Sequence, residues 1–216
     1  MVMLMGWAMP ARVSGTEGYA EAAEALLNQR LSFIDVHGPI LHLIPAAPRR
    51  VLDIGSGAGG DAASFAELGH SVVAVEPTDE LRIPAMARHP SSSIEWLDDA
   101  LPDLNSLLAR AETFDLVMLS AVWMHLDASQ RRHAMPKVAS LIRMGGMMIM
   151  SLRHGPVPQG RRMFEVSADE TIQLAREQGL DAVLNLRTDS VQEVNRRAGV
   201  TWTRLAFLKS SPNDAR

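Results

Sequence analysis

The sequence predicts an α/β fold in which a mainly parallel sheet is covered by helices on both faces. The first observation is that short apolar runs rich in β-branched residues alternate with segments of helical spacing. The second is that these runs are almost continuously apolar, which is typical of strands buried on both faces of a parallel sheet. With 216 residues, of which 47% are hydrophobic and 21% charged, the chain has the size and composition of one folded domain.

Seven strands are expected, and helical segments separate most of them. The strand candidates span residues 51–54, 71–76, 94–97, 114–120, 147–152, 182–186 and 202–208. The helices between them are expected to stop at glycines suited to a left-handed C-terminal cap, namely Gly69, Gly145, Gly179 and Gly199. Two helices are expected to begin at Ser-x-x-Glu capping boxes, formed by Ser167 with Glu170 and by Ser190 with Glu193.

Three further segments are less regular. Residues 128–144 place apolar side chains along one helical face, but Pro136 predicts a kink or a later helix start. Residues 18–35 have helical spacing, which predicts a helix that covers the sheet. The last run, 202–208, mixes polar and apolar residues on both faces, so it is expected to be an edge or hairpin strand.

These elements predict a single domain over residues 18–209. It is expected to consist of a helical cover at 18–48 and an α/β core at 49–209. A flexible N-terminal tail at 1–17 and a C-terminal tail at 210–216 complete the expected organisation.

Composition narrows the expected partners and location. A formal net charge of −4 gives no general attraction to nucleic acid or to an anionic membrane, so we expect a small-molecule ligand and a monomer or homodimer. The chain contains no cysteine, which excludes disulfides and thiolate chemistry and favours a reducing cytoplasm. The apolar stretch Met1 to Met9 lacks a basic leader and is too short to span a bilayer. Histidines and acids show no metal-ligand spacing, so no metal is expected.

The strongest local signal is RVLDIGSGAGGD at residues 50–61, which predicts a buried strand, a glycine turn and a helix start. Side chains at Gly55, Gly57 and Gly59 would block the approach of a ligand to the backbone N–H groups of this turn. The second strand ends at Glu76, whose carboxylate can accept both hydroxyls of an adenosine ribose. The combination predicts a nucleotide-type cradle, although the glycines also fit the G-x-G-x-x-G spacing of dinucleotide-binding folds.

These residues resemble the motifs of class I S-adenosylmethionine-dependent methyltransferases, and the resemblance runs through most of the chain. Residues 94–100 resemble the family's third-strand ending, 114–120 its fourth strand, and 141–146 the turn before its fifth, where Met144 stands in place of the usual proline. The resemblance implies a three-layer Rossmann-like sheet of order 3-2-1-4-5-7-6 with an antiparallel seventh strand, which would explain the irregular last run. It also implies S-adenosylmethionine as the cofactor and methyl transfer to a small molecule as the activity.

The same resemblance implies a set of cofactor-binding residues. Asp53 would lie beneath the methionine part of the cofactor, near its ammonium group, and Asp99 with the backbone of Ala100 would hold the adenine. Tyr19 resembles an N-terminal residue that closes over the cofactor carboxylate, while a ring that only packs on the core is the other interpretation. The full expected set is Tyr19, Asp53, Gly55, Ser56, Gly57, Gly59, Glu76, Pro77, Asp99, Ala100 and Ser120.

The acceptor is expected beyond the fourth strand, at the switch point where the strand order reverses. His125 follows that strand and is interpreted either as a general base or as a histidine packed at a loop–helix junction. Trp123 is interpreted either as a pocket wall or as a core residue.

A cluster of positive side chains follows the fifth strand. Arg153, His154, Arg161 and Arg162 stand before the first acid of this segment, Glu165. Guanidinium groups recognise carboxylate or phosphate, so the cluster predicts an anionic acceptor, with Arg153 pointing inward. Arginines that pair with nearby acids on a solvated loop are the alternative. The expected catalytic residues are therefore His125, His154 and Arg153.

Two other functions are considered. A nicotinamide-dependent oxidoreductase would use the same glycines and Glu76, but the lone Tyr19 is followed four residues later by Ala23, not by the lysine of a Tyr-x-x-x-Lys pair. Larger dehydrogenases need a second domain, for which the chain has no room. A non-catalytic S-adenosylmethionine-binding or interaction module that keeps the fold remains open.

Overall fold

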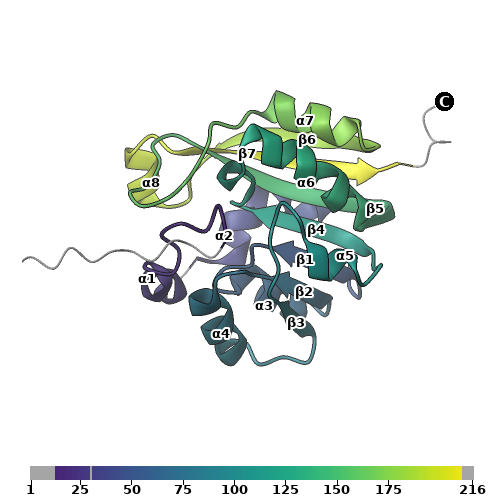
Figure 1. The fold of residues 1–216 in the computed structure, drawn as a ribbon, viewed down its shortest axis with the longest axis horizontal. Helices are drawn as coiled ribbons and strands as arrows, with labels where there is room; N and C mark the ends of the chain where they lie inside the picture. Colours follow the sequence, from purple (N-terminus) through teal and green to yellow (C-terminus); the bar gives the residue numbers. More distant parts are fainter. Residues whose placement is uncertain (1–12, 30, 211–216) are drawn as a thin grey trace, which may run out of the picture.

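The computed structural model describes residues 13–29 and 31–210, and its centre is a seven-stranded sheet (Figure 1). The strands are β1 (Arg50–Ile54), β2 (Ser71–Val75), β3 (Ile94–Leu97), β4 (Phe114–Ser120), β5 (Ile142–His154), β6 (Leu180–Asp189) and β7 (Thr201–Lys209). Their order is β3-β2-β1-β4-β5-β7-β6, with β7 antiparallel to both of its neighbours. All seven predicted strands and the predicted order are confirmed.

The helices lie on both faces of this sheet. They are α1 (Ala23–Asn28), α2 (Phe33–His37), α3 (Gly60–Glu67), α4 (Asp79–Arg88), α5 (Asn105–Leu108), α6 (Ala128–Ser140), α7 (Ala168–Arg176) and α8 (Glu193–Arg197), with 3-10 helices at Gly38–Leu43 and Trp123–His125. No helix of the described residues combines the length and the apolar character that crossing a bilayer requires.

The predicted single helix at 18–35 is wrong, because the cover consists of the two short helices α1 and α2. Gly18 has a φ of +75°, so no helix runs through that position. The side chain of Ser32 accepts a hydrogen bond from the backbone N–H of Asp35 and begins a new helix, α2. A local cap therefore overrides the continuous apolar spacing.

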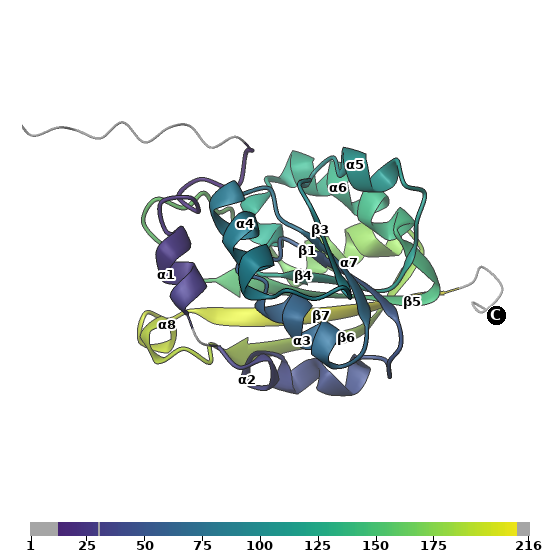
Figure 2. The same cartoon turned by 90° about the horizontal axis from the view of Figure 1, so that it is seen from below.

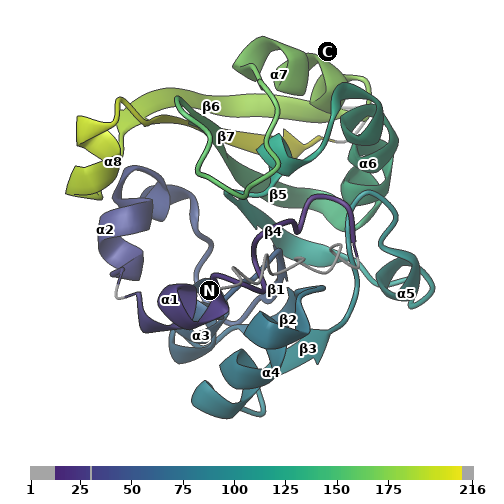
Figure 3. The same ribbon diagram turned by 60° about the vertical axis from the view of Figure 1, so that its left-hand side comes forward.

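The expected tails lie partly outside the described residues, namely 1–12 and 211–216. Residues 13–17, which were expected to belong to a flexible tail, instead form hydrogen-bonded turns. The Thr16 hydroxyl donates to the carbonyl of Val13 over 2.7 Å, and the Gly15 N–H donates to the Glu17 carboxylate over 2.7 Å. These turns and α1 lie across the ends of β1 and β4 (Figure 3).

Three smaller predictions about helix ends also need correction. Gly145 lies inside β5, at a register shift against β4, since α6 already ends at Ser140. Helix α6 starts at Ala128, behind a capping box of Asp127 and Gln130, and continues through Pro136. Helix α8 begins after Gln192, so Ser190 does not cap it, whereas Ser167 does cap α7.

Two apolar clusters fill the space between the sheet and its helices. One lies under α5, α6 and α7 and includes Phe114, Trp123 and Phe207. The other lies under α3 and the N-terminal cover and includes Ile40, Phe65 and Ala206 (Figure 2). Because side chains alternate along a strand, neighbours of Ala206 two positions away on β7 also face the α3 side.

The carboxyl ends of β1, β2, β4 and β5 meet at one edge of the sheet, and the antiparallel β7 begins at that edge. Cross-strand pairing places Ser120 of β4 beside Ser151 of β5, which lies beside Arg204 of β7. Asp53 of β1 lies on the same face. It pairs with Met118, which pairs with Ile149, which in turn pairs with Ala206, two residues after Arg204 on β7. The topology therefore brings polar side chains from four strands to one region.

Candidate active site

Two adjoining cavities open at this edge. The first, of about 300 Å³, lies over β1, β2 and β4 and is lined by residues of the glycine turn and by the turns at 13–16. The second, of about 520 Å³, lies over β4, β5 and β7 and reaches α2 and α8. Tyr19, Gly55 and Ser120 line both cavities, so the two form one continuous site.

The glycine turn of the first cavity is held in place by Glu76. The backbone N–H of Gly57 donates to one carboxylate oxygen of Glu76 over 2.9 Å, and that of Thr78 donates to the other over 2.8 Å. Burial raises the pKa of Glu76, and these hydrogen bonds oppose the rise. A Cβ atom at Gly57 would meet nothing within 4 Å, so the space before this residue is open to a ligand.

The other two glycines are needed for different reasons. A Cβ at Gly55 would come within 2.5 Å of Val122, and a Cβ at Gly59 within 2.5 Å of Trp96. Gly59 lines neither cavity and has a φ of +80° at the start of α3. In this structure Gly59 accommodates the packing of Trp96 and lies away from both cavities, so its role in cofactor binding stays a prediction.

Asp99 lines the first cavity, together with Pro77 and Ala100. Both of its carboxylate oxygens accept backbone hydrogen bonds, from Ala100 over 2.8 Å and from Leu107 over 2.9 Å. The carboxylate thus fixes the segment that follows β3 as well as facing the cavity. The sequence predicted a binding role for Asp99 but not its hydrogen bonds with the backbone of Ala100 and Leu107.

Asp53 is a buried carboxylate without a complete set of partners. Its side chain lines the second cavity, is 1% exposed, and its Oδ2 has no hydrogen-bond partner among the described residues. Burial holds the pKa of Asp53 well above its usual range, and the carboxylates of Asp61 and Glu76 raise it further. The hydroxyl of Ser56, in the same cavity, is also buried and unpartnered. A cationic ligand group would satisfy this carboxylate.

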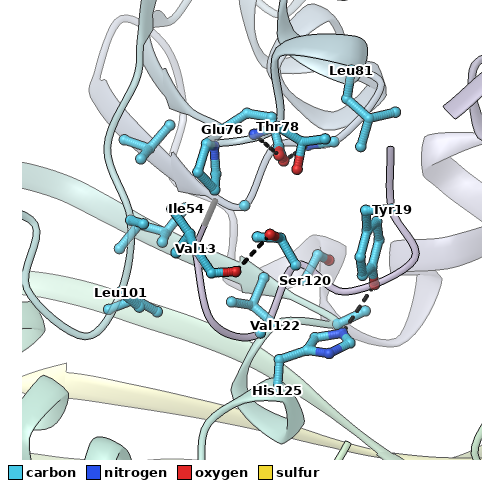
Figure 4. A pocket seen from close by; sticks show the side chains of 18 of the residues that line it. Val13, Tyr19, Ile54, Glu76, Thr78, Leu81, Leu101, Ser120, Val122 and His125 are labelled. Atoms are coloured by element: carbon cyan, nitrogen blue, oxygen red, sulfur yellow. Dashed lines mark hydrogen bonds between the residues drawn. The ribbon is translucent and has the colours of Figure 1, made fainter. Parts of the chain in front are cut away.

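Tyr19 and His125 meet where the two cavities join. The hydroxyl of Tyr19 lies 2.9 Å from Nε2 of His125 (Figure 4). Nδ1 of that ring lies 2.7 Å from the carbonyl oxygen of Arg162. A carbonyl only accepts, so Nδ1 carries the proton, and Nε2 of the neutral ring accepts from Tyr19. Burial lowers the pKa of His125, which favours the neutral form of the ring.

This pair decides between the interpretations of both residues. The Tyr19 hydroxyl proton is engaged by His125, so it is not free to donate to a cofactor carboxylate as the resemblance implied. His125 is not merely packed, because its Nε2 faces the hydroxyl that lines both cavities. Trp123, by contrast, is a fully buried core residue.

The residues of the positive cluster differ from one another. Arg153 lines the second cavity, although its Nη1 also donates to the carbonyl of Pro156 over 2.6 Å. The guanidinium of Arg161 stacks 3.6 Å above the Tyr19 ring, and its Nη1 is buried without a partner among the described residues. Arg162 lies near the carboxylates of Glu17 and Asp127, at 3.7 and 3.6 Å. Of these three arginines, only Arg162 therefore fits the alternative that the arginines pair with nearby acids.

His154 does not join the site. Its Nε2 lies 2.8 Å from the hydroxyl of Thr203 on β7, and the residue lines neither of the two cavities. The expected catalytic role of His154 is therefore not supported by its position. His154 points to the opposite face of the sheet from Arg153, as the alternation of side chains along β5 requires.

Arg204 is a site residue that sequence reasoning missed. It lines the second cavity and is only 6% exposed, and its Nε has no hydrogen-bond partner in the part of the chain described. The available signal was a charged residue in the middle of the apolar run 202–208. That run was interpreted as an edge or hairpin strand, and its arginine was not singled out.

Comparisons with known proteins agree with this architecture. Residues 51–146 match a family model described as a methyltransferase domain. An uncharacterized methyltransferase of Mycobacterium tuberculosis is 34% identical over 113 residues, which cover 49% of this chain and 40% of that protein. The chain thus aligns with less than half the length of this relative.

Two solved structures share the fold at low sequence identity. The 1,6-didemethyltoxoflavin-N1-methyltransferase of Burkholderia thailandensis, with bound 1,6-didemethyltoxoflavin and S-adenosylhomocysteine, has a TM-score of 0.68 and 21% identity, over 90% of this chain and 84% of that one. The N-methyltransferase NodS of Bradyrhizobium japonicum, in complex with S-adenosylhomocysteine, has a TM-score of 0.67 and 18% identity, over 90% and 100%. Together with the sheet order 3-2-1-4-5-7-6, these two structures show that the chain has the fold of these methyltransferases.

Proposed function

We propose that the protein transfers a methyl group from S-adenosylmethionine to a small molecule that carries an anionic group. The observation that carries the cofactor assignment is Asp53, a buried carboxylate with an unpartnered oxygen beside an open glycine turn. The ammonium group of the cofactor's methionine part supplies the cation that this carboxylate lacks. Glu76 stands at the end of β2, where an adenosine ribose binds in folds of this type.

The residues present fit such a cofactor along the continuous site. Glu76, Asp99 and Gly57 line the first cavity, which would take the adenosine half. Asp53 and Ser56 line the second cavity, where the methionine half would end. When bound, the cofactor supplies an electrophilic methyl group on a sulfonium ion, so the protein needs no strong nucleophile of its own.

The protein's residues then have two tasks. The walls of the two cavities align the acceptor atom with the methyl group and exclude water, which can supply a large part of the acceleration. Tyr19 receives the proton of an acceptor hydroxyl or amine as its own hydroxyl proton passes to Nε2 of His125. The acceptor's proton would thus be balanced by a proton held at Nε2 of His125, while the acceptor atom would take the methyl group that the cofactor would supply.

The anionic character of the acceptor rests on the second cavity. Arg153, Arg161 and Arg204 line it, and no ion pair of these arginines occurs among the described residues. Guanidinium groups in such a place recognise carboxylate or phosphate through paired N–H donors.

The experiment is calorimetry with S-adenosylhomocysteine, S-adenosylmethionine and NAD on the purified protein. We expect both sulfur ligands to bind and NAD not to bind. Glu76→Ala should weaken S-adenosylhomocysteine by roughly tenfold, or about 1.4 kcal/mol, because the Gly57 N–H loses its acceptor. Glu80→Ala, which removes an exposed acid of α4, is the control. Binding of NAD alone would refute the proposal, and tight cofactor binding without turnover on a broad substrate panel would favour a non-catalytic module.

A further inference from the structure

We infer that the acceptor is an apolar carboxylic acid whose carboxylate is held by Arg204 in the second cavity, and whose apolar body lies against α2, Met163 and Trp202. This inference rests on the proposed function and specifies its substrate class. It stands on three features of the second cavity: the placement of Arg204, the charge that surrounds it, and the apolar side chains in the lining.

The placement of Arg204 follows from the antiparallel direction of β7. Arg204 pairs with Ser151 of β5 on one side and with Leu186 of β6 on the other, so the strand holds its backbone from both sides. Ala206, two residues later on the same face, packs in the cluster of Phe65. The guanidinium is therefore held on the α3 face by a central strand, which gives it little freedom to reach solvent.

The charge of Arg204 has no direct counter-charge. The side chain is buried, its Nε lacks a hydrogen-bond partner, and no ion pair of this arginine occurs among residues 13–29 and 31–210. Burial lowers the pKa of Arg204, and the more distant Asp61 partly opposes this effect. A buried and unpaired guanidinium is costly for the folded state, so its retention in a cavity indicates a ligand that brings the opposite charge.

The charges of the whole cavity favour an acceptor with a single negative charge. Arg153, Arg161 and Arg204 are balanced in part by Asp53 and Asp61. A carboxylate oxygen of Asp61 lies 2.9 Å from Nε2 of His37, a residue that does not line the cavity. In the proposed function, Asp53 binds the ammonium group of the cofactor. The cofactor's own carboxylate offsets one arginine, which leaves room for one further monoanion.

Apolar side chains make up part of the lining of the second cavity. They are Phe33 and Val36 of α2, together with Met163 and Trp202, whereas Gln192 and Asn195 give the lining near α8 a polar character. Figure 3 shows α2 and α8 on the same side of the molecule, at the edge where β7 begins. The buried Arg204 and these apolar side chains together fit a ligand with a carboxylate at one end and a hydrocarbon or aromatic body at the other.

The mouth of the cavity carries the same signal. Leu31 and Val191 line the cavity and are 47% and 42% exposed. Single exposed apolar side chains are ordinary, but these two line the same cavity, one before α2 and the other before α8. An apolar acceptor that enters here would cover both.

The test uses the protein saturated with S-adenosylhomocysteine and four carboxylic acids: benzoic, phenylacetic, 3-phenylpropionic and octanoic. Each acid is compared by calorimetry with its own primary carboxamide, which keeps the shape and removes the charge. We expect at least one acid to bind at least tenfold more tightly than its amide. The preference should disappear in Arg204→Met, whose affinity for S-adenosylhomocysteine should stay within twofold of the wild type.

The control variant is Arg187→Met, which removes an exposed arginine of the neighbouring strand β6 that lines neither cavity. It should keep the preference for acids. Thermal unfolding adds a second readout, since Arg204→Met should unfold at a higher temperature than the wild type if the guanidinium is unpaired.

The inference would be overturned if no acid binds, if acids and amides bind equally, if Arg204→Met keeps the preference, or if that variant is less stable. A loss of S-adenosylhomocysteine affinity in Arg204→Met would assign this arginine to the cofactor carboxylate and overturn the inference as well. Failure of the wild type to bind S-adenosylhomocysteine would refute the proposed function itself, which separates the two outcomes.

Discussion

Arg131 and Arg204 are two arginines with almost the same exposure, 3% and 6%, and opposite surroundings. Arg131, on α6, donates to both carboxylate oxygens of Glu170 over 2.9 to 3.1 Å and to the carbonyl of Leu126 over 2.6 Å. Arg204, on β7, has a buried Nε with no partner among the described residues. The first joins α6 to α7, and the second faces a cavity.

The difference teaches how to separate structural charges from ligand-binding charges in this fold. A paired buried charge is complete without a ligand, and removal of its partner destabilises the protein. An unpaired buried charge costs stability, so its removal should stabilise the protein and impair binding. The same contrast separates the carboxylate of Glu76, which is hydrogen-bonded, from that of Asp53, which is not.

The largest expected effect tests the paired side of this comparison. Glu170→Ala should lower the free energy of unfolding by about 3 kcal/mol, because it leaves the buried guanidinium of Arg131 without a counter-charge. Urea titration measures the change. Glu193→Ala, which breaks an exposed pair with Arg197 on α8, should change stability by no more than about 0.5 kcal/mol. Equal effects of the two variants would break the comparison.

The next effect separates two glycines of one turn. Gly59→Ala should destabilise the fold by roughly 2 kcal/mol, since its Cβ would overlap Trp96. Gly57→Ala should cost only about 1 kcal/mol of backbone strain at a φ of +55°, because its Cβ meets nothing. The order should be reversed for the affinity for S-adenosylhomocysteine, which should fall more in Gly57→Ala than in Gly59→Ala. The expected loss in Gly57→Ala is tenfold or more. A larger stability loss in Gly57→Ala than in Gly59→Ala would contradict this assignment.

Asp53→Asn tests the effect of an unpaired buried charge, and the pH dependence of protein stability reveals it. Asp53 has a folded-state pKa above its unfolded value of about 3.9, so the folded state binds more protons than the unfolded state between these two values. Its contribution to stability therefore falls as the pH rises through this window. Asp53→Asn should be more stable than the wild type by about 1 kcal/mol at neutral pH and equal to it near pH 3, in thermal melts at each pH. A variant that is less stable at pH 7 would show that Asp53 is paired.

The smallest thermodynamic effect is expected for Tyr19→Phe. The ring keeps its contact with Arg161 and only the hydrogen bond to His125 is lost, so stability should fall by no more than about 1 kcal/mol. Affinity for S-adenosylhomocysteine should change less than threefold, since the hydroxyl serves His125. A tenfold loss of affinity for S-adenosylhomocysteine would instead support the role in cofactor binding that the family resemblance implies for this tyrosine.

The two halves of the site also differ in how far sequence predicts them. Glu76 and Gly57 were predictable because a buried strand, a glycine turn and the end of the next strand are local patterns with fixed geometry. The link between Tyr19 and His125 was not, because it joins residues 106 positions apart through turns that resembled a tail. Arg204 was missed for a similar reason, since its burial depends on α2 and α3 packing over a strand that looks exposed when considered alone.

The reversed direction of β7 affects how such a protein can diversify. Parallel strands deliver to the carboxyl edge only the residues that follow them, and here these residues include Glu76 and Ser120. The antiparallel β7 delivers its opening residues instead, Thr201 to Arg204, together with the preceding α8. Exchange of residues 190–204 between relatives would therefore alter the second cavity while leaving the first untouched. Under the proposed function, such a graft is expected to change the acceptor that the protein methylates.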